Sequence, residues 1–181
     1  GGGLAQVATA LIDETGNNNR DAALNKNDGG GSAGKVSVSQ TSDALIRTIG
    51  NGAVGIFAQT TGGTGGLIQQ ADGKLTIHNH KTAGTGGDIT ISQNGILKTE
   101  GDFADGIYAI AHGSDAPGDI DITVNGTVQT LGTDSDAVVA ASTAAGDRSG
   151  DITVNVSKGG RILSSGARGD AVVIDDTTPG F

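Results

Sequence analysis

Residues 86–113 read GGDITISQNGILKTEGDFADGIYAIAHG, and residues 117–141 repeat the pattern as PGDIDITVNGTVQTLGTDSDAVVAA. A shift of 31 positions, from Asp88 to Asp119, aligns the aspartates, the Asn-Gly pairs and the aliphatic residues of both copies without a gap. Self-similarity at a fixed period of roughly 20–50 residues is the signature of a stacked repeat protein. The repeat therefore indicates the fold class before any single residue is considered.

Two further copies flank this pair. Residues 34–59 read GKVSVSQTSDALIRTIGNGAVGIFAQ, and residues 149–174 read SGDITVNVSKGGRILSSGARGDAVVI. The last copy aligns with a shift of 32 positions at first and of 34 after its Ser-Lys-Gly sequence. We interpret residues 60–86 as an insert and residues 1–33 as an irregular N-terminal part of one solenoid domain over residues 1–181. Because LAQ near the N-terminus resembles LIQ in the insert, we expect the chain to begin in the middle of a repeat.

Each copy holds three short aliphatic runs separated by corners rich in glycine or Asn-Gly. The first run alternates as D-I-x-I/V, the second is short, and the third follows G/A-I/V-x-A. Such runs are typical of short strands, since alternation turns one face inward and glycine permits tight corners. Three strands in about 31 residues predict an all-β fold, a parallel β-helix with the right-handed winding that parallel connections prefer. An antiparallel hairpin array or propeller is the alternative, but a propeller blade needs roughly 40–45 residues.

Stacked coils bring equivalent positions into columns about 4.8 Å apart. Ile89, Ile120 and Ile152 then form an aliphatic ladder, and Asn94 and Asn125 form an amide ladder. Two sets of aspartates also recur once per coil, namely Asp88, Asp119 and Asp151, and Asp105, Asp136 and Asp170. They could form a calcium ladder or a carboxylate pair for glycoside hydrolysis, or they could cap local backbone N–H groups at corners. Because an active site is usually unique whereas these columns recur, we favour the capping role and predict no catalytic residue.

Composition and charge restrict the classes of molecule that this chain can bind. The formal net charge of −9 argues against nucleic acids and anionic membranes, which need lysine or arginine to neutralise phosphate. The aliphatic runs are far too short to span a membrane, so we expect no membrane insertion by this segment. Cysteine is absent from the sequence, which excludes disulfides and thiolate zinc sites. We predict no cofactor.

Three histidines are the remaining candidates for metal chemistry. KLTIHNHK at residues 74–81 places His78 and His80 on one face of a strand, where two imidazoles could form half of a metal site. No third ligand is identifiable in the sequence, so we favour a polar outer face and predict no metal site. His112 stands next to Gly113 and is interpreted as a turn residue. The sequence contains no G-x-S-x-G nucleophile motif, and we predict that the chain is not an enzyme.

Aromatic side chains make up only 2% of the chain, which disfavours a sugar-binding groove. Phe57 and Tyr108 share one column, which would point outward if Ile56 and Ile107 point inward. This patch could be covered by the insert.

Three phrases carry a family resemblance: GIFAQTTGGTGG (55–66), GDFADGIYAIAHG (101–113) and GDITVNVSKGGRILSSG (150–166). They resemble passenger domains of Gram-negative autotransporters and related large exoproteins, which alternate aliphatic strands, glycine corners and G-I-Y/F-A strands. The likeness covers most of residues 34–174. It implies a secreted, extracellular β-helical stalk at the bacterial cell surface, often adhesive or involved in aggregation or biofilm formation. The sequence departs from a complete family member in lacking a signal peptide and a translocator barrel, so we interpret it as an excised piece or an unrelated solenoid.

The resemblance makes a structural or adhesive role the leading hypothesis: a stalk or adhesin that presents loops to a host cell, a neighbouring cell or other copies of the chain. Arg168-Gly169-Asp170 matches the integrin-binding tripeptide, but Asp170 shares the column of Asp105 and Asp136, so we favour a corner of the coil. One alternative is a filament subunit that stacks end to end, because the ends of a β-helix expose strand edges. A polysaccharide-degrading β-helix is the third hypothesis.

Overall fold

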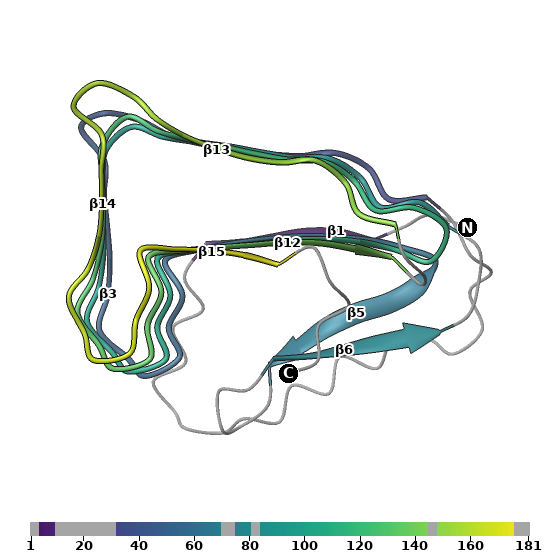
Figure 1. Cartoon of the computed structure of the whole chain (residues 1–181), viewed down its shortest axis with the longest axis horizontal. Coiled ribbons are helices and arrows are strands. Elements are labelled where there is room, and N and C mark those ends of the chain that lie inside the picture. The colour runs from purple at the N-terminus through teal and green to yellow at the C-terminus, as the bar shows by residue number, and fades with distance from the viewer. Residues whose placement is uncertain (1–3, 10–31, 70–74, 81–83, 145–147, 176–181) are drawn as a thin grey trace.

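The computed structural model describes residues 4–9, 32–69, 75–80, 84–144 and 148–175, and this part of the chain is built of strands without a helix. Most of the strands belong to four coils of three strands each, which overlie one another along a common axis (Figure 1). Coil 1 contains β2 (Val36–Gln40), β3 (Leu45–Thr48) and β4 (Ile56–Gly62), and coil 2 contains β7 (Ile89–Gln93), β8 (Ile96–Thr99) and β9 (Ile107–Gly113). Coil 3 contains β10 (Ile120–Val124), β11 (Thr127–Thr130) and β12 (Val138–Ala144), and coil 4 contains β13 (Ile152–Val156), β14 (Arg161–Ser164) and β15 (Val172–Asp175).

Equivalent strands of successive coils pair in parallel and form three sheets. The first sheet has the order β2-β7-β10-β13, the second β3-β8-β11-β14, and the third contains β4-β9-β12-β15. Ile89 lies opposite both Val36 and Ile120, and Val138 lies opposite both Ile107 and Val172. This register confirms the parallel β-helix of three strands per coil and the columns deduced from the repeat. The right-handed winding stays a prediction.

Aliphatic columns fill the space enclosed by the three sheets. Each inward side chain packs on its equivalents in the neighbouring coils, and burial of such a side chain stabilises the fold by roughly 1.5–3 kcal/mol. The fully buried members in the first and second sheets are Ile89, Ile91, Leu97, Ile120, Ile122, Val124 and Val128. The third sheet contributes a column of smaller residues, Ala58, Ala109 and Ala140, none of which is exposed.

Glycines at the corners allow the coils to approach each other closely. A Cβ atom added to Gly132 would lie 1.8 Å from the Gly101 carbonyl oxygen, and one added to Gly101 would lie 2.0 Å from the Gly50 carbonyl oxygen. Neither Gly101 nor Gly132 has a positive φ. Glycine is therefore required at these two positions by the spacing between coils and not by the backbone conformation.

Strand β1 (Leu4–Thr9) does not continue the repeat. It pairs antiparallel with β4, with Leu4 opposite Thr61 and Thr9 opposite Ile56. A strand of a coil would pair in parallel, so β1 is not a strand of a regular coil. β1 instead covers the edge of the third sheet at coil 1, which would otherwise present unpaired backbone groups.

The inserted segment begins later than the sequence pattern indicated. Residues 60–62 continue β4, and the equivalent strands β9 and β12 extend just as far. The aliphatic pattern of the sequence does not indicate this extension, because its buried residues, Thr60 and Thr61, are polar. β5 (Thr64–Gln69) and β6 (Leu75–His80) then form an antiparallel hairpin on the outer side of the third sheet (Figure 1).

The outer face of the third sheet carries a second apolar cluster. Phe57 and Tyr108 stack with their ring centroids 5.9 Å apart and their planes at 19°. Tyr108 is only 5% exposed and packs with Ile110, Val139 and Ala141. The shared outward column of the two aromatic residues is thus confirmed, and strands β9 and β12 of the third sheet are buried on both faces.

Candidate functional site

The corner between the second and third strands of each coil contains the tripeptide Arg168-Gly169-Asp170 and one of the two aspartate columns. One position of this corner has a positive φ in all four coils: 69° at Gly52, 55° at Phe103, 53° at Asp134 and 61° at Arg168. Side chains larger than glycine seldom adopt this conformation, which costs about 1–2 kcal/mol per residue. Glycine at position 52 and, more weakly, aspartate at position 134 are residue types that favour this conformation, whereas Phe103 and Arg168 are not.

A buried threonine in each of the first three coils holds this corner in place. The Thr99 hydroxyl donates a hydrogen bond to the Ala104 carbonyl oxygen at 2.5 Å, and the Thr130 hydroxyl donates to the Ser135 carbonyl oxygen at 2.9 Å. Thr48 makes the same contact with the Ala53 carbonyl oxygen in coil 1 at 2.7 Å. The bond spans the residue with positive φ, so it fixes the corner from inside the coil.

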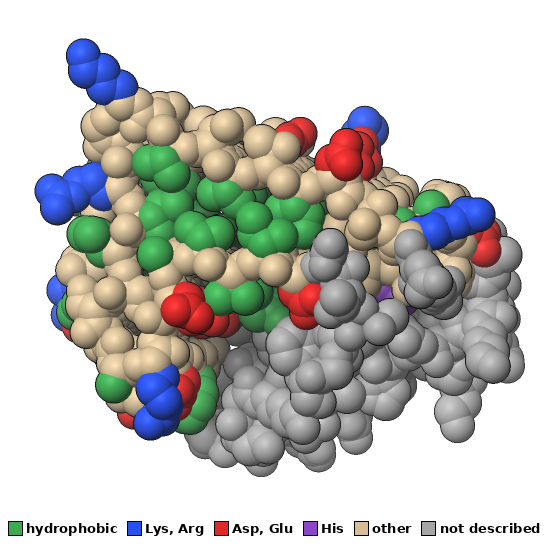
Figure 2. Space-filling model, in the orientation of Figure 1, with side chains coloured by type: hydrophobic (Ala, Val, Ile, Leu, Met, Phe, Trp, Pro, Cys, Tyr) green, Lys and Arg blue, Asp and Glu red, His purple; other side chains and the backbone are tan. Residues whose placement is uncertain are grey.

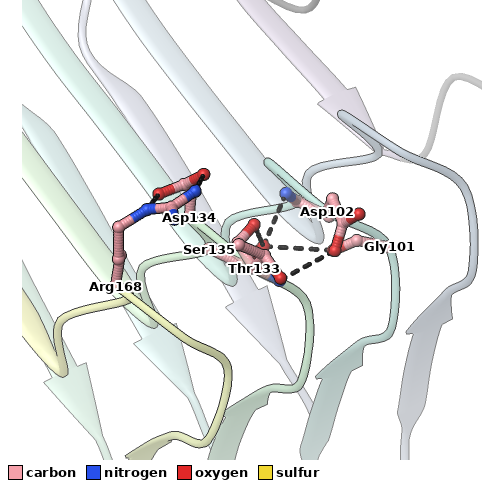
Figure 3. A network of polar contacts seen from close by, with 7 residues as sticks. Gly101, Asp102, Thr133, Asp134, Ser135 and Arg168 are labelled. Atoms are coloured by element: carbon pink, nitrogen blue, oxygen red, sulfur yellow. Dashed lines mark hydrogen bonds and ion pairs between the residues drawn. The ribbon is translucent and has the colours of Figure 1, made fainter.

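Hydrogen bonds also link the corners of neighbouring coils (Figure 3). The Ser135 hydroxyl donates to the Gly101 carbonyl oxygen at 3.1 Å and accepts the Ala104 N–H at 3.0 Å. The Asp102 carboxylate accepts the Thr133 N–H at 2.8 Å. These bonds satisfy backbone groups that a loop would otherwise leave for solvent.

Arg168 is directed to the preceding coil. Its guanidinium forms a fork with the Asp134 carboxylate, with distances of 2.7 Å from Nε to Oδ1 and 2.5 Å from Nη2 to Oδ2 (Figure 3). The guanidinium holds the pKa of Asp134 below its ordinary value. The backbone N–H of Asp170 donates to the Asp136 carboxylate at 2.7 Å. Arg168 and Asp170 are therefore both tied to coil 3, through a side chain in one case and the backbone in the other.

Both aspartate columns serve as hydrogen-bond acceptors between coils. Oδ1 of Asp105 accepts the Asp136 N–H at 2.8 Å, in the same way that Asp136 accepts the Asp170 N–H. In the other column, Asp88 accepts the Asp119 N–H at 3.2 Å and Asp119 accepts the N–H of its equivalent in coil 4 at 2.9 Å. The aspartates do accept backbone N–H groups, but each N–H belongs to the next coil, so the prediction that they cap local N–H groups is wrong.

Burial raises the pKa of two of these carboxyls, Asp105 and Asp136, and that of Asp105 the more strongly. Asp105 lies half-buried in its corner, and burial raises the pKa of this group to about 6, with the Asp136 charge acting in the same direction. The hydrogen bond from the Asp136 N–H favours the ionised form and opposes the rise. Asp105 is thus the carboxyl with the raised pKa that a general acid would need, but its Oδ1 atom is already engaged by the backbone.

Replacing Asp105 by asparagine is expected to flatten the pH dependence of stability. Because the pKa in the fold exceeds the ordinary value of 3.8, the stability due to this carboxyl is full below about pH 3.8 and is lost as the pH rises through about 6. Asparagine keeps an Oδ1 acceptor for Asp136 but does not titrate. At about pH 7.5 the variant should gain about 1–2 kcal/mol in free energy of unfolding, less than the shift alone would predict because the side chain is partly exposed.

Urea unfolding at about pH 4.5 and about pH 7.5 measures this difference. Asp121→Asn is the matched control, because Asp121 is exposed on the outer face of β10. An equal gain in both variants at the higher pH would contradict the prediction, since it would reflect only the reduced negative charge.

The histidines lie in strands. β6 contains His78 and His80, opposite Gly66 and Thr64 of the hairpin. Their side chains lie outside the described part of the structure, so the predicted polar outer face and the alternative of a half metal site are both untested. The interpretation of His112 as a turn residue is wrong: it is buried in β9, and its Nδ1 atom lies 3.0 Å from the Thr143 hydroxyl. Within the described ranges, no three histidine or acidic side chains gather as a metal site would require.

Amide side chains form two ladders, of which the sequence indicated one. Asn125 donates to the Asn94 side-chain oxygen at 2.6 Å, which confirms the predicted corner ladder. The second lies inside the solenoid, where the buried Gln93 amide donates to Gln40 at 3.1 Å and to the Gly95 carbonyl oxygen at 2.6 Å. Gln40 and Gln93 occupy a column that continues as Val124 in coil 3.

The chain matches no known family model, no curated protein and no solved structure. Its resemblance to autotransporter passenger domains therefore rests on the sequence phrases alone. In the described residues we find no helix with the length and apolar character needed to cross a membrane.

Proposed function

We propose that this chain is a structural segment of a secreted bacterial surface protein, in which the stacked coils form a stalk that presents loops for adhesion. The use of the acidic side chains carries this proposal. Both recurrent aspartate columns accept backbone N–H groups of the next coil, as do Asn51 and Asp102 at the same corner. Side chains committed to holding coils together favour a scaffold over a catalyst.

The β5–β6 hairpin is the best candidate for the presented element. It leaves the solenoid between β4 of coil 1 and β7 of coil 2, and the coils on either side of it pair without interruption. An excursion that the coils do not need for their own pairing can carry a binding role. The expected partners are a host cell, a neighbouring bacterial cell or another copy of the protein.

The integrin-type tripeptide is a weaker candidate for adhesion. Integrin binding by this signal needs the arginine and the aspartate together, whereas Arg168 is engaged by Asp134 in an exposed ion pair. Such a pair contributes only about 0–1 kcal/mol, so a receptor could compete for the guanidinium. The tripeptide therefore enters the experiment as a separate variant.

Surface display tests the proposal. Bacteria that display residues 1–181 are expected to adhere to host cells or to aggregate more than bacteria that carry the empty display vehicle. A variant with residues 64–83 replaced by a Gly-Ser linker should lose this adhesion and keep the strand signal in circular dichroism. Asp170→Glu should retain both.

Two results would count against this assignment. If the displayed chain neither adheres nor aggregates, the adhesive role fails. If Asp170→Glu abolishes attachment with the fold intact, the tripeptide is the adhesive element and the hairpin is not. A glycan-cleaving activity that disappears in Asp105→Asn would replace the structural assignment with the enzymatic one.

A further inference from the structure

The end of the solenoid at coil 4 exposes apolar side chains that every other coil buries. Val172 and Ile174 are 40% and 53% exposed, whereas Val138 and Ala140 in the same columns of coil 3 are completely buried. Val156 on the first sheet is likewise 50% exposed. Figure 2 shows hydrophobic side chains gathered as one patch inside the frame of the coil. Coil 3 uses the equivalent face to pack against coil 4, and in coil 4 this face is exposed.

The same end carries two aspartate carboxylates whose equivalents in the preceding coils each accept a backbone N–H. Asp119 and Asp136 each accept a backbone N–H from coil 4. Their equivalents in coil 4 are Asp151 and Asp170, and no N–H of the described residues reaches these two carboxylates. Strands β13, β14 and β15 also lie at the ends of their sheets. The surface at coil 4 therefore combines three features: exposed apolar side chains, carboxylates that accept no N–H of the described residues, and the edges of three sheets.

The opposite end of the solenoid is covered along the third sheet. β1 pairs along β4, and Val36, Ile56 and Ala58 of coil 1 are as well buried as their equivalents in coils 2 and 3. A second copy could therefore not place its own coil 1 on coil 4 without displacing β1. Two copies joined through their coil 4 ends would face each other with strands running in opposite directions, so the parallel register that places each N–H over the aspartate of its own column could not form. Neither arrangement of two copies suits this surface.

We propose that the exposed end of coil 4 is a docking surface for one further parallel β-helical coil, carried by a polypeptide segment of the same repeat pattern. Three requirements identify this partner. It places backbone N–H groups over Asp151 and Asp170, aliphatic side chains over Val172 and Ile174, and a glycine over Gly166. The glycine follows from the spacing between coils, since a Cβ on Gly166 would itself lie 1.7 Å from the Gly132 carbonyl oxygen. This inference depends on the stacking of the coils and not on the adhesive role.

An added coil tests the docking surface directly. A second copy of residues 145–175 is inserted after Asp175 in the full chain, so that residues 176–181 still end the protein. Amide hydrogen exchange in β13, β14 and β15 should slow by about tenfold or more relative to the unextended chain. The control insert carries serine in place of the aliphatic residues copied from Ile152, Val154, Val172 and Ile174. Equal exchange rates with both inserts would overturn the proposal.

Two aspartate variants then report whether the new coil pairs in register. Asp170→Ala should leave the folding equilibrium of the unextended chain nearly unchanged and lower it by about fivefold or more in the extended chain, because only there does Asp170 accept an N–H. Asp136→Ala serves as the reference and should lower the equilibrium in both chains. An equal effect of Asp170→Ala in both chains would contradict docking in register. A dimer of the unextended chain in sedimentation, with β13–β15 protected, would assign the surface to a second copy and overturn the proposal.

Discussion

Gly132→Ala is expected to lower the free energy of unfolding by about 3 kcal/mol or more, or to prevent folding altogether. The added methyl group would lie 1.8 Å from the Gly101 carbonyl oxygen, which belongs to the backbone of the neighbouring coil and cannot rotate away. Relief would require coils 2 and 3 to separate at this corner, which would lengthen the hydrogen bonds from coil to coil. Thermal and urea unfolding followed by circular dichroism measure the loss.

Gly50→Ala is the matched control, because Gly50 occupies the same column in coil 1 with no coil of the solenoid stacked before it. Its added Cβ would meet only the Ala53 Cβ atom, at 3.6 Å, which is an ordinary contact. This variant should change stability by less than about 0.5 kcal/mol, or increase it slightly by restricting the unfolded chain. Equal losses from Gly50→Ala and Gly132→Ala would show that alanine is harmful at this corner for a reason other than coil spacing.

Thr99→Val is expected to lower the free energy of unfolding by about 1–3 kcal/mol. Valine has nearly the same shape as threonine and suits a strand, so the change removes the hydroxyl with little loss of packing. The Ala104 carbonyl oxygen then loses its 2.5 Å partner in a buried corner that already carries the positive φ of Phe103. Urea unfolding provides the measurement.

Thr90→Val provides the comparison, since Thr90 is exposed on the outer face of β7 in the same coil. It should alter stability by less than about 0.5 kcal/mol. A loss below about 0.5 kcal/mol in Thr99→Val as well would mean that the corner does not depend on the threonine bond.

The repeat alone was enough to predict the coils. Identical spacing from Asp88 to Asp119 and from Ile107 to Val138 set the parallel register, because a stacked solenoid pairs each residue with its equivalent. The Asn94–Asn125 ladder followed from the same alignment. These contacts join residues that are far apart in the chain. They can nevertheless be predicted from the sequence, because the repeat spacing tells which residues are equivalent.

The candidate site was predictable only in part. The recurrence of aspartate indicated an architectural role, but not that the acceptor reaches the N–H of the next coil. Nothing in the residue types of Phe103 or Arg168 signals a positive φ, because these types seldom adopt it and the conformation belongs to the corner that all four coils share. The ion pair of Arg168 with Asp134 joins coils 3 and 4, and it becomes visible only when the two corners are stacked.

The strands outside the repeat were the least predictable. Residues 1–33 were predicted to be irregular, and the sequence did not indicate that Leu4–Thr9 forms a strand paired antiparallel with β4. The direction of such a strand depends on the free sheet edge available to it, which no repeat encodes. His112 was read as a turn residue because it precedes a glycine, whereas β9 continues through both and buries the imidazole.

The sequence by itself determined the coil length, the strand register and the column that each repeated residue occupies, because the repeat period is present in the order of the residues. Only the tertiary structure decided which end of the solenoid is covered, which corner residues adopt a positive φ, and which N–H each carboxylate accepts. Those features depend on distances between neighbouring coils and on unpaired strand edges, which exist only once the coils are stacked.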